Sequence, residues 1–185
     1  MSRQLHKSTA QLDKEATLIG IAQKNPKGFE PLYNAYFEQI YRFVYQRVES
    51  REEAGDITSQ VFLKALLNIG KYIFRSLPFS AWLYRIAINE ISSYYTNTKK
   101  SRVVNIQTEQ LGLFFDDANE EFKEDQIEEI LNALKFLDPE DLLLIEMRFF
   151  EEKPFKEIAD ILGISENNAK VKLYRVLDKL KQKIL

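Results

Sequence analysis

The sequence predicts an all-α protein of two small helical domains joined by an acidic linker. Apolar residues recur every three or four positions in almost every segment, and no segment alternates convincingly as a β-strand would. The 185 residues fit one domain or two small ones, with an ordinary apolar share of 45%. We place the domains at residues 1–100 and 123–185 and the linker at residues 101–122.

Four helices are expected in the N-terminal domain. The first covers residues 16–24 and ends at Asn25-Pro26, because proline disfavours a helical residue before it. The second starts near Gly28 and carries one broad apolar stripe. The third is REEAGDITSQVFLKALLNI, residues 51–69, and its apolar stripe is Ala54, Ile57, Val61, Phe62, Ala65, Leu66 and Ile69. A loop with Gly70 and Pro78 then precedes a fourth helix that begins FSAWLYRIAINE.

The C-terminal domain has helix-turn-helix spacing. Periodicity fades in the linker, and helices resume at KEDQIEEILNALKFL. Asp138-Pro139 ends one helix and begins the next, since proline suits a first helical turn. In FKEIADILGISENNAKVKLYRVLDKL a short helix ends at Leu162, Gly163 supplies the turn and Ser165 caps the last helix.

The residue types present exclude most catalytic chemistry. The chain has no cysteine, so disulfides and thiolate zinc sites are excluded. The only histidine, His6, lies in a polar tail, so neither a catalytic triad nor a histidine metal site is available. Carboxylate pairs such as Glu128-Glu129 remain, but adjacent helical residues diverge by about 100°. We expect no enzyme, no metal and no cofactor.

No targeting or membrane segment is predicted. The N-terminus MSRQLHKSTAQLDKE is polar and lacks the apolar core of a secretory signal. No apolar run reaches the roughly 18 residues that a membrane span needs. We therefore expect a cytoplasmic protein without membrane insertion.

Charge is distributed unevenly, although the formal net charge is only −2. Residues 1–105 carry 15 Lys and Arg against 9 Asp and Glu, and residues 156–185 carry 7 against 4. The segment between them carries 4 against 15. Basic ends suit an anionic partner such as nucleic acid, although surface charge also varies without any function.

The last helix divides into two faces when positions are advanced by about 100° per residue. The apolar face holds Ala169, Leu173, Val176, Leu177, Leu180 and Ile184. Val171 lies nearly opposite, where it has no core to join but can touch a thymine methyl group. The exposed face predicts major-groove contacts, and the alternative is a plain hairpin with a solvated basic face. The candidate DNA-binding residues are Ser165, Asn167, Asn168, Lys170, Val171, Lys172, Tyr174 and Arg175.

The helix FSAWLYRIAINEISSYYTNTKK divides in the same way. One face, the expected core, holds Leu83, Tyr84, Ala87, Ile91, Tyr94 and Tyr95. The other holds Trp82, Arg85, Asn89, Ser93 and Thr96. An aromatic ring, a cation and small polar groups suit unstacked bases, which stack on rings and are read by amides. The alternative for Trp82 is that the preceding loop covers it and that it belongs to the core.

Three stretches resemble bacterial RNA polymerase sigma factors of the extracytoplasmic-function (ECF) type. EIADILGISENNAKVKLYRVLDKL resembles the family's DNA-binding domain, although Asn168-Ala169 stand in place of the usual threonine-valine. EEAGDITSQVFLKAL resembles the segment that docks on the polymerase largest-subunit coiled coil, and FSAWLYRIAINE resembles the block that follows. The resemblance covers roughly residues 15–100 and 123–185.

The resemblance implies a sigma factor that binds core RNA polymerase and directs promoter recognition, DNA opening and transcription initiation. The domains would correspond to sigma region 2 and sigma region 4. The implied partners are core polymerase, through the largest-subunit coiled coil and the second-subunit flap, promoter DNA and an anti-sigma factor. The implied polymerase-binding residues are Glu53, Asp56, Ile57, Gln60, Val61 and Lys64.

In this family the loop before the aromatic helix helps to hold a base flipped out of the downstream promoter element. Extruding a base costs a few kcal/mol, so stacking and cationic groups are needed there. Tyr72 and Phe74 fit this role, and they fit equally a loop pinned to the core. The implied downstream-element residues are Lys71, Tyr72, Phe74, Arg75, Ser76, Trp82, Arg85, Asn89, Ser93, Thr96, Lys99 and Lys100.

The helix FSAWLYRIAINEISSYYTNTKK differs from the family in its charged residues. The family often has an aspartate where Ser93 stands and arginines near Ile88 and Thr96. Fewer phosphate contacts weaken the electrostatic part of DNA affinity. We therefore expect little promoter binding by the free protein.

Two other functions remain open. A stand-alone helix-turn-helix regulator would never dock on polymerase, and a helical adaptor would bind only protein. A response regulator would need an α/β receiver domain, for which the sequence has no pattern.

The family's linker threads the polymerase cleft, and we expect Phe114 and Phe115 to anchor it.

Overall fold

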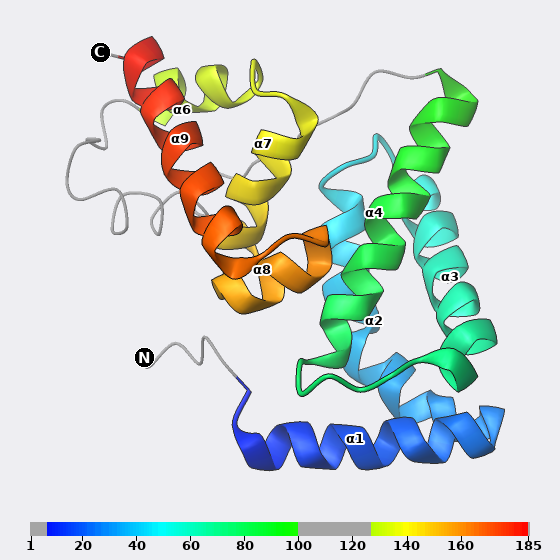
Figure 1. Ribbon diagram of the computed structural model, residues 1–185. Helices are drawn as coiled ribbons and strands as arrows, with labels where there is room; N and C mark the ends of the chain where they lie inside the picture. The colour runs from blue at the N-terminus through cyan, green and yellow to red at the C-terminus, as the bar shows by residue number, and fades with distance from the viewer. Residues whose placement is uncertain (1–6, 100–126, 185) are drawn as a thin grey trace. The chain divides into compact units, whose positions relative to one another are not determined.

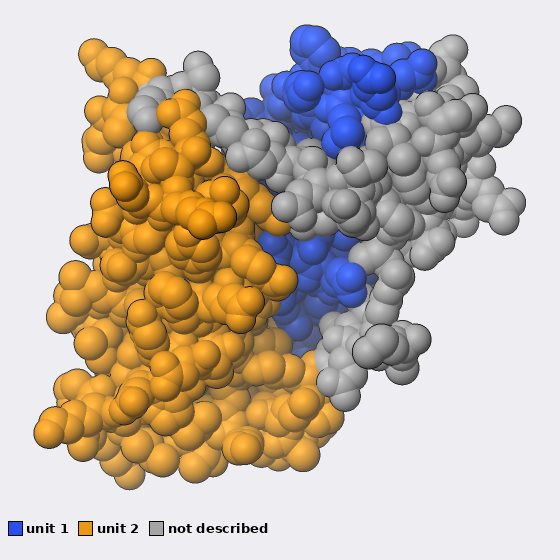
Figure 2. Space-filling view, turned by 180° about the vertical axis from the view of Figure 1, so that it is seen from behind, with its two compact units in different colours: residues 1–5, 106–185 blue, residues 6–105 orange. Residues whose placement is uncertain are grey.

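The computed structural model describes residues 7–99 and 127–184, and every regular element in these two ranges is a helix (Figure 1). The all-α prediction is thereby confirmed. The described residues belong to two compact units, an N-terminal one and a C-terminal one, which Figure 2 colours separately. The predictions on the linker and on Lys100 fall outside the described residues. Within the described ranges, no helix combines the length and the apolar character that crossing a membrane requires.

Residues 7–99 of the N-terminal unit form four α-helices and two 3₁₀ turns. They are α1 (Thr9–Lys24), η1 (Pro26–Phe29), α2 (Glu30–Tyr45), α3 (Arg51–Asn68), η2 (Ile69–Lys71) and α4 (Phe79–Thr98). The first helix begins at Thr9 rather than at the predicted Ala16. Ser8 and Gln11 form a capping box that starts it early: each side chain accepts a hydrogen bond from the other residue's backbone N–H.

An aromatic core holds these helices together. The rings of Phe62 and Phe79 lie edge-on to the ring of Phe29, at 6.5 and 6.3 Å between centroids. The predicted core face of α4 is confirmed, because Leu83, Tyr84, Ala87 and Ile91 are buried and Tyr94 and Tyr95 half-buried. The Tyr84 hydroxyl accepts a hydrogen bond from Gln39 Nε2 at 3.0 Å, which satisfies its buried polar group.

The C-terminal unit contains α6 (Ile127–Leu134), α7 (Pro139–Ile145), the π-helical turn η5 (Glu146–Phe150), α8 (Phe155–Leu162) and α9 (Glu166–Ile184). The predicted break at Asp138-Pro139 is confirmed. Gly163 follows α8 with a φ of 68°, in the left-handed region that glycine adopts without strain. The Ser165 hydroxyl accepts a hydrogen bond from the Asn168 N–H at 3.2 Å, so the predicted cap of α9 is also confirmed.

The apolar stripe of α9 packs as the sequence predicted. Its buried members are Ala169, Leu173, Val176, Leu177 and Leu180, whereas the side chain of Ile184 is not described. Lys179 also ties α9 to α7, because its Nζ lies 2.6 Å from Asp141 Oδ2. This hydrogen bond and the Asp141 charge raise the pKa of Lys179 above its ordinary value.

Candidate functional site

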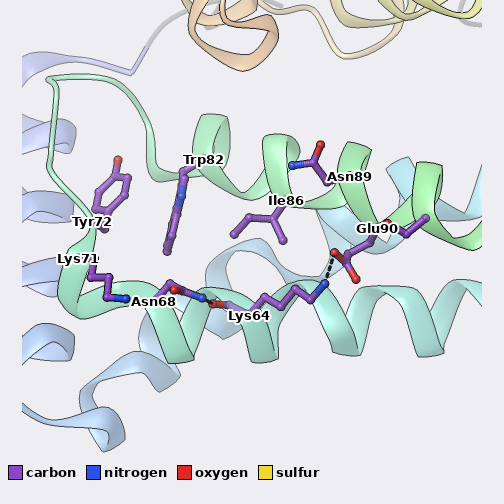
Figure 3. A pocket seen from close by; sticks show the side chains of 9 residues that line it. Lys64, Asn68, Lys71, Tyr72, Trp82, Ile86, Asn89 and Glu90 are labelled. Atoms are coloured by element: carbon purple, nitrogen blue, oxygen red, sulfur yellow. Dashed lines mark hydrogen bonds and ion pairs between the residues drawn. The ribbon is translucent and has the colours of Figure 1, made fainter.

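An open pocket of about 530 Å³ lies between α3 and α4 in the N-terminal unit (Figure 3). It is lined by Lys64, Asn68, Lys71, Tyr72, Trp82, Ile86, Asn89, Glu90 and Ser93. A smaller hollow of about 200 Å³ shares Glu90 and Ser93 with it and reaches Asp56 and Gln60 on α3. The two hollows therefore follow the seam between α3 and α4.

Aromatic rings form one wall of this pocket. The Trp82 ring lies 4.7 Å from the Tyr72 ring and 5.4 Å from the Phe79 ring, between centroids. Phe79 is fully buried, whereas Tyr72 and Trp82 are half-buried. Figure 3 shows the Tyr72 and Trp82 rings side by side. The Trp82 ring thus packs on the loop, as the core alternative expects, and it also lines the pocket.

The opposite part of the pocket is polar. Asn89 is exposed on α4, one turn beyond Ile86. Lys64 Nζ lies 2.5 Å from Glu90 Oε1, and the Glu90 side chain is only 13% exposed. Glu90 was not predicted as a lining residue, because its pairing with Lys64 depends on the register between α3 and α4. This ion pair offsets one cation of the pocket and leaves the exposed Lys71 at the other end.

The pocket gathers only some of the predicted downstream-element residues. Lys71, Tyr72, Trp82, Asn89 and Ser93 line it. The others do not line it: Arg75, Ser76, Arg85, Thr96 and Lys99 are exposed, and Phe74 is half-buried. The Thr96 hydroxyl donates to the Ser92 carbonyl at 2.9 Å.

The predicted polymerase-binding residues divide into surface and core. Asp56, Gln60 and Lys64 are exposed on α3. Ile57 is 7% exposed and Val61 is fully buried, so their side chains pack α3 on the core of the N-terminal unit.

The surface of α3 differs from the prediction at Glu53, Leu63 and Leu67. The Glu53 carboxylate accepts hydrogen bonds from the Ser50 N–H, at 3.2 Å, and from the Tyr94 hydroxyl, so it caps α3. Leu63 and Leu67 are 47% and 72% exposed and were not predicted. Both lie outside the apolar stripe of α3. An apolar residue outside such a stripe is exposed, and this is the sequence signal that could have predicted them.

The predicted DNA-facing side of α9 is exposed. Asn167, Asn168, Lys170, Tyr174 and Arg175 are exposed, and Val171 is 40% exposed although it is apolar. Lys170 Nζ lies 2.9 Å from Glu166 Oε1 on the preceding turn.

Lys172 and Ser165 differ from this set. Lys172 Nζ lies 3.6 Å from Glu140 Oε2 on α7, so this side chain points away from the exposed face. Ser165 is occupied in capping α9.

Comparison with known proteins assigns a family to both units. Residues 32–101 match the model of Sigma-70 region 2, and residues 127–180 match that of Sigma-70 region 4. The ECF RNA polymerase sigma factor BldN of Streptomyces coelicolor is 29% identical over 184 residues, 93% of this chain and 67% of that protein. The RNA polymerase sigma factor YlaC of Bacillus subtilis is 29% identical over 165 residues, 86% of this chain and 93% of that protein.

A solved structure has the same fold. CnrH, in complex with the cytosolic domain of CnrY, is similar with a TM-score of 0.58 and 19% identity. The similarity covers 90% of this chain and 94% of CnrH.

Proposed function

Because this chain belongs to the sigma-70 family, among the ECF-type sigma factors, we propose that it binds core RNA polymerase and directs promoter recognition, DNA opening and transcription initiation. The observation that carries the proposal is the aromatic and polar pocket, which lies within the region 2 match. A protein that only bound duplex DNA through α9 would have no use for such a pocket. The proposed site of action is the cytoplasm, and the chemistry of initiation belongs to the polymerase.

In this proposal the pocket receives an unstacked base of the downstream promoter element. The Trp82 ring offers a stacking face, and the Asn89 amide carries both donors and an acceptor for a base edge. Lys71 at the rim adds a cation for a phosphate. A base that finds these partners regains part of the stacking and pairing energy lost when it leaves the duplex.

We expect Asn89→Ala to reduce promoter opening roughly tenfold, because a base-reading amide contributes about 1–3 kcal/mol. Asn89 is exposed, so its loss should leave folding and polymerase binding unchanged. Permanganate reactivity of promoter thymines measures opening, and Asn34→Ala, which removes an exposed amide from α2, is the control. Loss of opening and of polymerase binding together would contradict a base-reading role.

The exposed side of α9 is proposed to read the upstream promoter element in the major groove. Asn167 lies at the start of α9, the part of a recognition helix that reaches base edges. Val171 is proposed to touch a thymine methyl group.

Asn167→Ala should weaken upstream-element recognition by about 1–3 kcal/mol and relax the preference at one base pair. The measurement is initiation by the complete polymerase complex on promoters altered at each upstream position. Gln182→Ala, an exposed amide near the far end of α9, serves as the control. An unchanged preference at every upstream position would reject the assignment of Asn167.

Polymerase docking is proposed for the exposed side of α3. Asp56, Gln60 and Lys64 supply polar groups there, and Leu63 and Leu67 supply apolar surface next to them. An anti-sigma factor is proposed as a further partner, as the family implies. The alternative function, a stand-alone helix-turn-helix regulator, would leave this surface and the pocket unused.

A further inference from the structure

We propose that α1 positions the loop that walls the pocket. This pocket loop, residues 72–78, joins η2 to α4 and carries Tyr72. Figure 1 shows α1 running past the ends of α3 and α4 that the loop connects. The inference rests on the proposed function only for what the pocket binds, and α1 lies outside the residues matched by the region 2 model.

Gln23, in the last turn of α1, holds the start of the pocket loop. Its Nε2 donates a hydrogen bond to the Ile69 carbonyl at 3.1 Å and another to the Tyr72 carbonyl at 2.8 Å. A side-chain amide has two N–H donors, and here both are used on carbonyls at the two ends of η2. The backbone of Tyr72 is therefore tied to α1.

Glu15, near the middle of α1, holds the end of the loop. Its Oε2 accepts a hydrogen bond from the Phe79 N–H at 2.9 Å. The N-cap residue of α4 is Pro78, which makes no side-chain capping bond. The carboxylate of Glu15 supplies that cap from another helix, and a helix N-terminus favours a negative charge.

The Glu15 carboxylate is itself held firmly. The residue is 4% exposed, and its Oε1 accepts hydrogen bonds from the Tyr36 hydroxyl and from Lys7 Nζ, the latter at 2.7 Å. Three partners from separate parts of the chain fix its position. The carboxylate that caps α4 is therefore held in a fixed position.

The pocket loop needs these two anchors because its own conformation is unfavourable. Ser76 has a φ of 56°, which a residue other than glycine rarely adopts and keeps only where its surroundings hold it. Ile73 is 72% exposed, so that side chain contributes little burial to the loop. Gln23 and Glu15 are thus positioning residues that set the Tyr72 ring against Trp82.

The test uses Trp82, which is the only tryptophan in the chain. Its fluorescence reports on the wall of the pocket without any DNA. Gln23→Ala removes both donors, and Gln23→Glu replaces them with acceptors that repel the two carbonyls. Lys24→Ala, at an exposed position next to Gln23 on α1, is the matched control.

Both Gln23 variants should make Trp82 more accessible to the quencher acrylamide, with helical circular dichroism unchanged. Initiation with core polymerase, on a genomic promoter fragment selected with the wild-type chain, should fall roughly three- to tenfold, as expected for lost hydrogen bonds. Binding to core polymerase should be unchanged. Lys24→Ala should match the wild type in every measurement.

Two results would overturn the role of α1. One is that both Gln23 variants match Lys24→Ala in quenching and in initiation. The other is that they lose helical structure and polymerase binding together with initiation, which would make Gln23 a residue of the fold alone. If the wild-type chain fails to initiate with core polymerase, the proposed function fails, and acrylamide quenching still decides what α1 does.

Discussion

Replacing Trp82 with alanine is expected to lower open-complex formation by roughly ten- to a hundredfold, the largest functional effect of any single change in the pocket. Stacking of a base on an aromatic side chain is worth about 1–3 kcal/mol, and every 1.4 kcal/mol is a factor of ten. In the proposed function, alanine at this position would leave the unstacked base without its stacking face. The Tyr72 ring, 4.7 Å from that of Trp82, would also lose this ring contact, although it would keep the contact with the Phe79 ring at 5.4 Å.

The matched variant is Trp82→Phe, which keeps a ring and is expected to retain most of the activity. Rates of opening are compared at saturating core polymerase, so that binding of the chain to the polymerase does not limit them. The unfolding transition of each variant, followed by circular dichroism, separates a lost base contact from lost packing against Phe79. Promoter opening by Trp82→Ala at the wild-type rate would remove Trp82 from the DNA interface.

Replacing Glu15 with alanine should produce the largest loss of stability, about 3 kcal/mol or more in the free energy of unfolding. The change removes a buried acceptor from the Phe79 N–H and from the Tyr36 hydroxyl, and it leaves the Lys7 ammonium without its carboxylate. Buried donors without acceptors are costly, because folding has already taken them out of water.

Urea unfolding followed by Trp82 fluorescence measures this loss, since the only tryptophan lies in the N-terminal unit. Asp13→Ala is the control, because it removes an exposed carboxylate from the same helix and should change stability by less than about 0.5 kcal/mol. Equal stability of the two variants would contradict the role of Glu15 as an internal cap.

Faces of single helices were predictable from the sequence. The apolar stripe of α9 and the core face of α4 follow from the 100° step between helical residues, and the structure confirms both. Val171 is informative for the same reason, because an apolar residue opposite the stripe is exposed wherever the helix lies. These predictions need only the geometry of one helix.

Contacts between helices were not predictable in this way. The pairing of Lys64 with Glu90 and the capping of α4 by Glu15 both join residues far apart in the chain, and no single-helix pattern marks them. Glu15 appears in the sequence as one of several charges in a polar segment, yet it is buried.

The case of Ile57 and Val61 is different. Both belong to the apolar stripe of α3 and are buried, as helical periodicity predicts. Their implied role in polymerase docking stays a prediction. The start of α1 at Thr9 could also have been predicted from the sequence, because Ser8 and Gln11 have the spacing of a capping box.

Initiation by purified core RNA polymerase on genomic promoter fragments, with and without this chain, tests the central claim most directly. We expect transcripts from defined start sites only when the chain and core polymerase are both present. We also expect little DNA protection by the chain alone, since α4 carries few cations. Tight, specific protection of DNA by the free chain, with no stimulation of core polymerase, would contradict the account and favour a stand-alone regulator.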